Sequence, residues 1–535
     1  MNKQPPATDS REWDAIVIGT GIGGATVGRS LALAGHSVLF LEKGGRVGSG
    51  LENNGTAAPE ARMAAGWWPY PVTQRKSNGS RRRFYAAIGC AVGGSSVHYA
   101  AALERMAGSD FEGLQTPSGS TPPWPVSFAE FVTHYAAAEK LYSIVDASSS
   151  AAERRMSEWD RALLVQMRAN GLRPDPLHVA IRYDEQCEEC IGKICPRDCK
   201  SDARVACLQE ALRQPQCQLL ESCDVQTLDA DRARVRVVKA KHGGHELRLR
   251  ARIVVLSAGA LHSPQILLRS RNDTWPHGLA NSSDQVGRNL MFHTSDVFAL
   301  WAPRRLSRHA RQRKSISVRD FYARDGRRLG YVQSMGLEAG RGEIAALIKD
   351  QLRRRGLNNE LLLSLLAKIP SHVGALLCGG AGIFAAMTED DPNPDNRIIL
   401  DPDEPDGASF SYTITDDLRR RADELRHAFS RGVQPWRLLR ITNELEMNYG
   451  HPCGTCRFGD DPTVSVLDRD CRAHDLENLY VVDASFMPRS GAVNPSLTIA
   501  ANALRVAPHI AARLSNISAQ SATHRMQYYS HAARD

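Results

Sequence analysis

The stretch that decides the fold is DAIVIGTGIGGATVGRSLALAGHSVLFLE, from Asp14 to Glu42. Its apolar start is typical of a buried strand, and a glycine-rich turn, a helical segment and a second apolar run follow. The spacing G-x-G-x-x-G permits a tight turn, close approach of a pyrophosphate and tight helix–strand packing at Gly19, Gly21 and Gly24. Glu42 closes the unit as an acceptor for a ribose hydroxyl. The stretch predicts a dinucleotide site, and by itself it does not choose between NAD and FAD.

The composition is typical of a soluble globular protein. The 535 residues are 42% hydrophobic and 24% charged, with a formal net charge of +8. We interpret the basic residues as a solvated surface, with attraction to an acidic partner or a membrane face as the alternative. We find no nucleic-acid motif. The polar start, MNKQPPATDSREW, lacks the apolar core of a signal peptide, so we expect a cytoplasmic protein unless a partner subunit carries it across a membrane. The apolar segment from Leu361 to Met387 includes charged, proline and glycine residues, so no membrane span is expected.

A second glycine-rich turn lies in IGCAVGGSSVHYAAALERM, from Ile88 to Met106. Gly93, Gly94 and Ser95 would present consecutive backbone N–H groups with little side-chain bulk, so the turn can lie flat against a phosphate or an aromatic ring. The run between the two turns, Lys43 to Asn78, is rich in glycine, proline and small polar residues. Its tryptophans suit either a lid over a cofactor or ordinary packing onto the body.

Together these segments resemble the glucose–methanol–choline (GMC) family of FAD-dependent oxidoreductases. Further segments are similar to other motifs of the family, in the family's order: GALHSPQILL (259–268), QVGRNLMFH (285–293), EDDPNPDNRIIL (389–400), HPCGTCRFG (451–459) and VVDASFMPRSGAVNPSLTIAANALR (481–505). Several ordered motifs in one chain are far more specific than any one of them. The resemblance implies an FAD cofactor and the oxidation of a CH–OH group.

The resemblance also implies the architecture. It implies an α/β fold (α+β overall) in which a Rossmann-like FAD-binding domain is interleaved with a smaller substrate domain whose sheet roofs the flavin. The FAD-binding domain would comprise residues 12–108, 215–300 and 445–513, and the substrate-binding domain residues 109–214 and 301–444.

Local patterns add to this layout. Alternating residues predict paired strands at 235–238 and 247–249. Helices are predicted at 343–368 and 416–429, with arginines that we interpret as solvated and with partner docking as the alternative. We expect a disordered polar tail over residues 516–535.

The C-terminal motifs contain the candidate catalytic residues. Oxidising an alcohol requires that a proton leaves the oxygen and a hydride leaves the carbon; a flavin accepts the hydride at N5, and the protein must take the proton. A histidine suits this role because its ordinary pKa is near neutral. The resemblance places the catalytic base at His451 and the second member of a His–Asn pair at Asn494, whose amide would hold the substrate oxygen.

Further cofactor contacts follow from the same motifs. Pro495 and Ser496 begin an apolar helix whose N-terminus would stabilise the negative charge of a reduced flavin by about 0.3–2 kcal/mol. By resemblance, Asp483 would contact the ribityl or phosphate region, and we assign Val225 to the same cofactor-binding set. His98 lies where some family members join a histidine covalently to the flavin, and a packed, hydrogen-bonded histidine is the alternative.

The twelve cysteines are unevenly distributed, with five between Cys187 and Cys207. The spacing C-x2-C-x4-C-x3-C would let four thiols converge on one ion or cluster, at Cys187, Cys190, Cys195 and Cys199. Some dehydrogenases of the family bind an iron–sulfur cluster in the corresponding region. An iron–sulfur cluster, zinc, and plain thiols or local disulfides are the three alternatives, and we assign no metal ligand.

We therefore predict an FAD-dependent oxidoreductase that acts on an alcohol, polyol or sugar and resembles the gluconate-, sorbitol- and fructose-type dehydrogenases. Its partners would be a small-molecule alcohol and either oxygen, in an oxidase, or a cytochrome or quinone that accepts electrons. A sterol or another bulky alcohol is an alternative substrate. An NAD-dependent Rossmann enzyme gives no role to the motifs after His451. A non-catalytic flavoprotein has no need of His451 and Asn494.

Overall fold

The opening motif folds as its sequence predicts, into strand β1 (Glu12–Ile18), helix α1 (Ile22–Leu33) and strand β2 (Val38–Leu41). The computed structural model describes residues 11–48, 59–76, 78–116, 119–144, 156–183, 186–303, 313–323, 327–338, 345, 348–349, 352, 357, 359–378, 380–442 and 445–532. Almost every residue of β1 and all of β2 are buried, as expected for parallel strands covered on both faces.

These strands belong to a seven-stranded sheet with the order β8-β2-β1-β11-β10-β9, in which β21 also pairs with β11. Its other strands are β8 (Cys217–Leu220), β9 (Cys223–Ala230), β10 (Val235–His242), β11 (His245–Leu256) and β21 (Leu479–Val481). Strands β8, β2, β1, β11 and β21 are parallel, so their carboxyl ends meet at one edge. The predicted strand pair is confirmed, since β10 and β11 are antiparallel with Val238 opposite Leu249.

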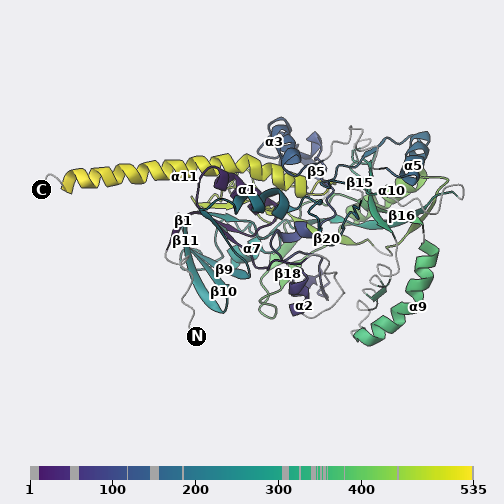
Figure 1. The fold of residues 1–535 in the computed structure, drawn as a ribbon, viewed down its shortest axis with the longest axis horizontal. Helices are drawn as coiled ribbons and strands as arrows, with labels where there is room; N and C mark the ends of the chain where they lie inside the picture. The colour runs from purple at the N-terminus through teal and green to yellow at the C-terminus, as the bar shows by residue number, and fades with distance from the viewer. Residues whose placement is uncertain are drawn as a thin grey trace.

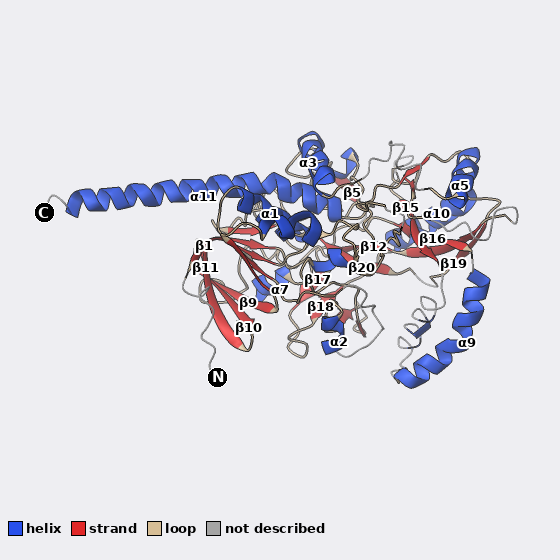
Figure 2. Cartoon of the chain, viewed as in Figure 1, coloured by secondary structure: helices blue, strands red, loops and turns tan. Residues whose placement is uncertain are grey.

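A six-stranded antiparallel sheet has the order β19-β13-β16-β15-β14-β7. Its strands are β7 (Pro174–Pro176), β13 (Asp296–Trp301), β14 (Ile316–Val318), β15 (Tyr331–Glu338), β16 (Ala381–Met387) and β19 (Arg437–Arg440). Helices α5 (Glu158–Ala169) and α10 (Asp416–Gly432) share a hydrophobic cluster with it, and α10 confirms the helix predicted at 416–429. Figure 2 shows the two large sheets at opposite sides of the molecule. The proposed domain borders stay a prediction; β13 crosses the one expected at residue 300.

Smaller elements lie between and around the sheets. A two-stranded ladder joins β12 (Met291–Thr294) to β20 (Met447–Cys453), and a four-stranded sheet has the order β17-β18-β3-β4. The remaining strands are β3 (Val72–Arg75), β4 (Arg81–Phe84), β5 (Leu114–Thr116), β6 (Gly119–Thr121), β17 (Arg397–Ile399) and β18 (Ala408–Ser411). The short helices are α2 (Pro59–Ala64), η2 (Gly94–Val97), η3 (Gly108–Asp110), η4 (Arg204–Leu208), α6 (Gln209–Ala211), α7 (Ser263–Arg269) and η5 (Ala484–Phe486).

The C-terminal helix corrects one expectation. Helix α11 runs from Ser496 to Ala532, so the segment predicted to be a disordered tail is helical. Residues 509–532 contain neither glycine nor proline, and nothing in their sequence interrupts a helix that has already begun. In Figure 1 the end of α11 extends beyond the body of the molecule, whereas its start packs against α1 and α3 (Phe128–Leu141).

Two other predictions concern the segment before β16. The helix predicted at 343–368 lies largely outside the described residues; helix α9 (Glu360–Cys378) covers its end. Helix α9 lies at the periphery in Figure 1. A search of the described helices found none with the length and apolar character needed to cross a membrane.

Candidate functional site

A cavity of about 530 Å³ is lined by both the opening glycine turn and the C-terminal motifs. Its volume is in the range of small-molecule and cofactor sites. Most of the predicted site residues line it: Gly19, Gly21, Glu42, Gly94, Ser95, His98, Val225, His451, Asp483, Asn494, Pro495 and Ser496. Gly24 and Gly93 lie behind this surface. A side chain at Gly24 would begin 2.2 Å from the Gly19 carbonyl oxygen, so Gly24 permits close packing of the turn.

Thr20 connects the opening glycine turn to Glu42 and to the second glycine turn, a role that the sequence did not reveal. Its backbone N–H and its hydroxyl donate to the same carboxylate oxygen of Glu42, at 3.0 and 2.6 Å. The other oxygen accepts from the Gly44 N–H at 3.0 Å. The Thr20 hydroxyl oxygen accepts in turn from the Gly93 N–H at 2.9 Å. Burial raises the pKa of Glu42, while these hydrogen bonds act in the opposite direction. In the sequence, the only signal for this role was that the residue between Gly19 and Gly21 has a hydroxyl group.

The GALHS motif and the VVDAS motif meet at Asp483, just after β21. Its carboxylate accepts from the Gly259 N–H at 2.9 Å and from the Ser263 hydroxyl at 2.5 Å. It also accepts from the Ser485 hydroxyl and from the Ser485 N–H, the latter at 2.8 Å, and so caps the short helix η5. Burial raises the pKa of Asp483, and the four hydrogen bonds that stabilise the charged form oppose this. Asp483 therefore holds the GALHS and VVDAS motifs together beside the cavity.

His98 is packed between the second glycine turn and the loop that contains Trp67. Its ring stacks on Trp67, with centroids 4.0 Å apart and planes inclined by 12°. Its Nε2 lies 3.2 Å from the Gly66 carbonyl oxygen, and therefore carries the proton when the ring is neutral. Burial lowers the pKa of His98 to about 4. Its Nδ1 has no hydrogen-bond partner among the described residues. Covalent attachment of this ring to a flavin stays a prediction.

The end of the cavity that contains His451 and Asn494 lies beneath the six-stranded sheet. His451 is on β20, and Asn494 directly precedes Pro495 and α11. The roof comes from alternate residues of adjacent strands, namely Ser295, Val297, Gln333, Met335, Ala385 and Met387. Burial lowers the pKa of His451 to about 3. His451 is therefore a neutral imidazole at neutral pH.

His293 is a residue whose role sequence reasoning missed. It ends the QVGRNLMFH motif, and its Nδ1 lies 3.0 Å from Nδ1 of His451. The two residues are far apart in the chain, and they meet because β12 pairs with β20, with His293 opposite Asn448. The available signal was the motif itself, which marked the segment without assigning a role to its histidine.

The cavity fits the FAD that the sequence implies. A side chain on Gly21 would meet no protein atom within 4 Å, so the backbone there is open to a ligand. Six buried polar atoms on the cavity residues have no partner within the described part of the chain: Trp67 Nε1, Trp68 Nε1, His98 Nδ1, His262 Nε2, Gln333 Oε1 and Asn494 Oδ1. Buried polar atoms are normally hydrogen-bonded, so these atoms indicate a polar ligand. The glycine turn and Glu42 would hold its diphosphate and ribose, and the residues around His451 its ring.

The cysteine segment lies against the second glycine turn. The Gly192 N–H donates to the His98 carbonyl oxygen at 3.0 Å. The buried Lys200 ammonium donates to the carbonyls of Val97, Tyr99, Cys190 and Lys193. The sulfur atoms of Cys195 and Cys199 are 3.4 Å apart. In the described part of the chain, no group of three or more His, Cys, Asp or Glu side chains has a geometry that would hold a metal. The alternatives raised by the spacing stay predictions.

Comparisons with known proteins agree with this geometry. Two family models described as GMC oxidoreductase match residues 13–295 and 392–503. The chain is 28% identical to 6'''-hydroxyparomomycin C oxidase of Streptomyces lividus, over 97% of this chain and 94% of that protein. It is 25% identical to the fructose dehydrogenase large subunit of Gluconobacter japonicus, over 93% of this chain and 97% of that protein.

The fold is shared with solved structures. The crystal structure of pyridoxine 4-oxidase from Mesorbium loti aligns with a TM-score of 0.62 at 20% identity, covering 93% of this chain and 99% of that one.

Proposed function

Because the chain belongs to the GMC oxidoreductase family and is an FAD-dependent enzyme that oxidises CH–OH groups, we propose that its substrate is a neutral sugar or polyol and that His451 is the base. The observation that carries the proposal is that His451 and Asn494 line the same cavity as the early glycine turn. When bound, FAD supplies the hydride acceptor.

The acid–base chemistry follows from the state of His451. Burial lowers its pKa to about 3, so the imidazole is unprotonated at neutral pH and its lone pair is free for the proton of a substrate hydroxyl, although the same burial makes it a weaker base. The Asn494 side chain, buried with an unpartnered Oδ1, would hydrogen-bond the substrate and fix the reacting carbon. Removing His451 should therefore slow the reaction without preventing FAD binding.

The roof supports a neutral substrate. Of the residues that the structure describes along β13, β15 and β16 as lining the cavity, none is acidic, and Ser295 and Gln333 supply the polar contacts. The Lys314 side chain is buried and close enough to lower the pKa of His451. A cationic amino sugar would therefore have no counter-charge at the roof, and the protonated form of Lys314, whose own pKa burial lowers to about 7, would repel it.

We also propose an electron-transfer partner, a cytochrome or quinone, as the oxidant of the reduced enzyme. The likeness to a relative named as the large subunit of a dehydrogenase supports this. Another relative is named an oxidase, so oxygen is the competing acceptor. Oxygen consumption that keeps pace with substrate oxidation, with no stimulation by ubiquinone or a cytochrome, would refute the partner proposal.

The proposal is tested by adding D-fructose, D-sorbitol, D-glucosamine and paromomycin anaerobically to the purified protein and recording the flavin absorbance. We expect the neutral compounds to bleach the flavin and the cationic ones to fail. His451→Ala should keep its flavin and be reduced about 10²–10⁴-fold more slowly, the usual contribution of a general base. His245→Ala, on an exposed hairpin, is the control and should match the wild type. Equal rates for His451→Ala and the wild type would refute the role of His451.

A further inference from the structure

We propose that His293 is a positioning residue that selects the tautomer of His451, so that Nδ1 of His451 carries a proton and Nε2 is free to accept one from the substrate. The functional meaning of this inference depends on the proposed role of His451 as the base. The tautomer itself follows from the geometry around the two rings.

His293 is held at both of its ring nitrogens. Its side chain is only 1% exposed. Its Nε2 lies 3.2 Å from the Ser490 carbonyl oxygen and 2.9 Å from that of Gly491. Its Nδ1 lies 3.0 Å from Nδ1 of His451. The pairing of β12 with β20 brings the rings of His293 and His451 together.

The position of the protons follows from these contacts. Carbonyl oxygens only accept hydrogen bonds, so Nε2 of His293 must carry a proton. Burial lowers the pKa of His293, and the nearby Glu389 carboxylate acts in the opposite direction without reversing the effect. A neutral ring has one proton, so Nδ1 of His293 is an acceptor. The proton shared by the two Nδ1 atoms therefore belongs to His451, and its Nε2 has a free lone pair.

One neighbour would favour the opposite tautomer. The Asn448 side-chain nitrogen lies 3.2 Å from Nδ1 of His451, and an amide N–H can only donate. If Asn448 controlled the ring, Nδ1 would be unprotonated, and Nε2 would carry the proton and could not act as a base. The His293 contact is shorter, and the carbonyl pair leaves His293 no other way to satisfy its Nε2. We therefore assign control of the tautomer to His293.

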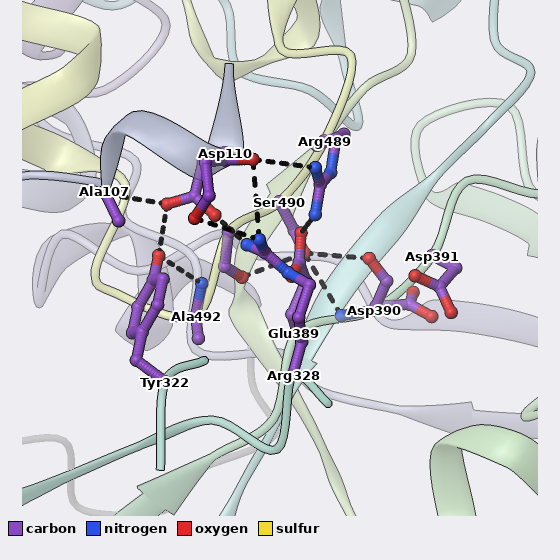
Figure 3. A network of polar contacts seen from close by, with 12 residues as sticks. Ala107, Asp110, Tyr322, Arg328, Glu389, Asp390, Asp391, Arg489, Ser490 and Ala492 are labelled. Atoms are coloured by element: carbon purple, nitrogen blue, oxygen red, sulfur yellow. Dashed lines mark hydrogen bonds and ion pairs between the residues drawn. The ribbon is translucent and has the colours of Figure 1, made fainter. Parts of the chain in front are cut away.

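A buried ionic network fixes the carbonyl pair that orients His293 (Figure 3). Arg489 and Arg328 donate to the two oxygens of Glu389, at 2.8 and 2.6 Å. Although burial opposes ionisation, the two arginines hold the pKa of Glu389 below its usual value. The Ser490 hydroxyl donates to the Asp390 carbonyl oxygen at 3.0 Å. The segment with the Ser490 and Gly491 carbonyls is therefore held at its N-terminal end.

The same segment is also held on its other side. The Tyr322 hydroxyl oxygen accepts from the Ala492 N–H at 3.1 Å and donates to Asp110 at 2.5 Å. Asn494 follows two residues later. This network of ion pairs and hydrogen bonds therefore orients the His293–His451 pair. The same network holds the backbone segment that leads to Asn494.

The role of His293 after proton transfer follows from the same geometry. When Nε2 of His451 takes the substrate proton, the ring becomes an imidazolium with protons on both nitrogens. Its Nδ1–H keeps its hydrogen bond to the neutral Nδ1 of His293, and a bond from a charged donor is stronger than one from a neutral donor. His293 therefore stabilises the protonated base without itself taking part in the transfer.

The first test reads the tautomer and does not require turnover. The FAD-loaded protein is labelled with ¹⁵N in its histidine rings, and the His451 signals are identified by comparison with His451→Ala. We expect Nδ1 of His451 to be protonated in the wild type. A wild-type spectrum with the proton on Nε2 would overturn the inference. Because the wild-type spectrum decides the tautomer, the test holds even if a variant fails to fold.

The second test compares two variants. Gln in place of His293 keeps an acceptor and a donor, whereas Phe keeps the ring shape and has neither. We expect His293→Gln to retain the Nδ1–H tautomer. We expect His293→Phe to shift the proton of His451 to Nε2, so that Nδ1 accepts a hydrogen bond from the Asn448 amide. Unchanged tautomers in both folded variants would overturn the assignment.

The third test measures the rate of flavin reduction in these variants, with the alcohol that bleaches the wild type fastest. His293→Phe should reduce its flavin about 100-fold more slowly, within the range for loss of general-base catalysis, and with a larger solvent isotope effect than the wild type. His293→Gln should recover most of the rate. An equal loss in both variants, with no change of isotope effect, would indicate a purely structural role. If His451→Ala alone proves fully active, the proposed function fails while the NMR result still decides the tautomer.

Discussion

Replacing Gly94 by alanine is the sharpest test of the contact between the two glycine turns. Gly94 begins η2 with a φ of +58°, and an added Cβ would lie 2.8 Å from the Gly21 Cα, against at least 3.4 Å for ordinary contact. Gly21 is the residue whose backbone is open to the ligand. The substitution therefore displaces one glycine turn from the other at the place where we expect the diphosphate of FAD.

Gly35 provides a matched control for the backbone conformation. Its φ is +89°, and an added Cβ would meet nothing within 4 Å. Both variants incur the cost of a left-handed non-glycine residue, about 1–2 kcal/mol. Only Gly94→Ala adds an overpacking term, about 1–3 kcal/mol when backbone must move. If that term acts on the turn that binds FAD, the Kd of FAD rises about 5- to 150-fold.

The assay combines flavin content after purification, titration of flavin-free protein with FAD, and urea unfolding of both variants. We expect Gly35→Ala to retain wild-type FAD affinity and to lose only the conformational contribution to stability. Gly94→Ala should lose FAD at equal protein concentration. If Gly94→Ala binds FAD as tightly as Gly35→Ala, the contact with Gly21 does not shape the cofactor site, and the reasoning is wrong.

Two further predictions concern the buried network behind the end of the cavity that contains His451 and Asn494. Burial raises the pKa of Asp390 to about 7, so the folded protein binds this proton more tightly than the unfolded chain does. Asp390 therefore makes the wild type more stable as the pH falls from 8 to 5. Asp390→Asn should lack this contribution when the free energy of unfolding is measured in urea at each pH. A variant with the wild-type pH dependence would contradict the assignment. Arg489→Met breaks a buried ion pair and should lower the free energy of unfolding by about 3–5 kcal/mol, whereas Arg420→Met, at an exposed pair, should change it by less than about 1 kcal/mol. Similar losses in the two variants would show that burial does not govern these pairs.

The local elements were predictable because short-range physics controls them. A buried apolar run, a glycine turn and an amphipathic segment follow one another between Asp14 and Glu42, and the strand, helix and strand form where the pattern places them. The helix α10 and the β10–β11 hairpin were predictable for the same reason. The error at the C-terminus was also local, because polarity was interpreted as disorder in a segment without helix breakers.

The ordered motifs marked His451 and Asn494 as site candidates, and both line the cavity, yet the motifs could not assign His293 or Thr20. A hydroxyl beside a glycine and a histidine at the end of a strand have no distinctive signal, since their roles depend on partners far along the chain. The pairing of β12 with β20 supplies one partner, and the approach of the second glycine turn supplies the other.

The residues alone were enough to predict the dinucleotide-binding unit, the family and the proposed His451–Asn494 pair. Which nitrogen of His451 faces His293, and which side chains form the roof over the cavity, became evident only from the fold. The physical reason is that strand periodicity and turn chemistry act between near neighbours, whereas proton positions depend on hydrogen-bond partners that folding brings together from distant segments.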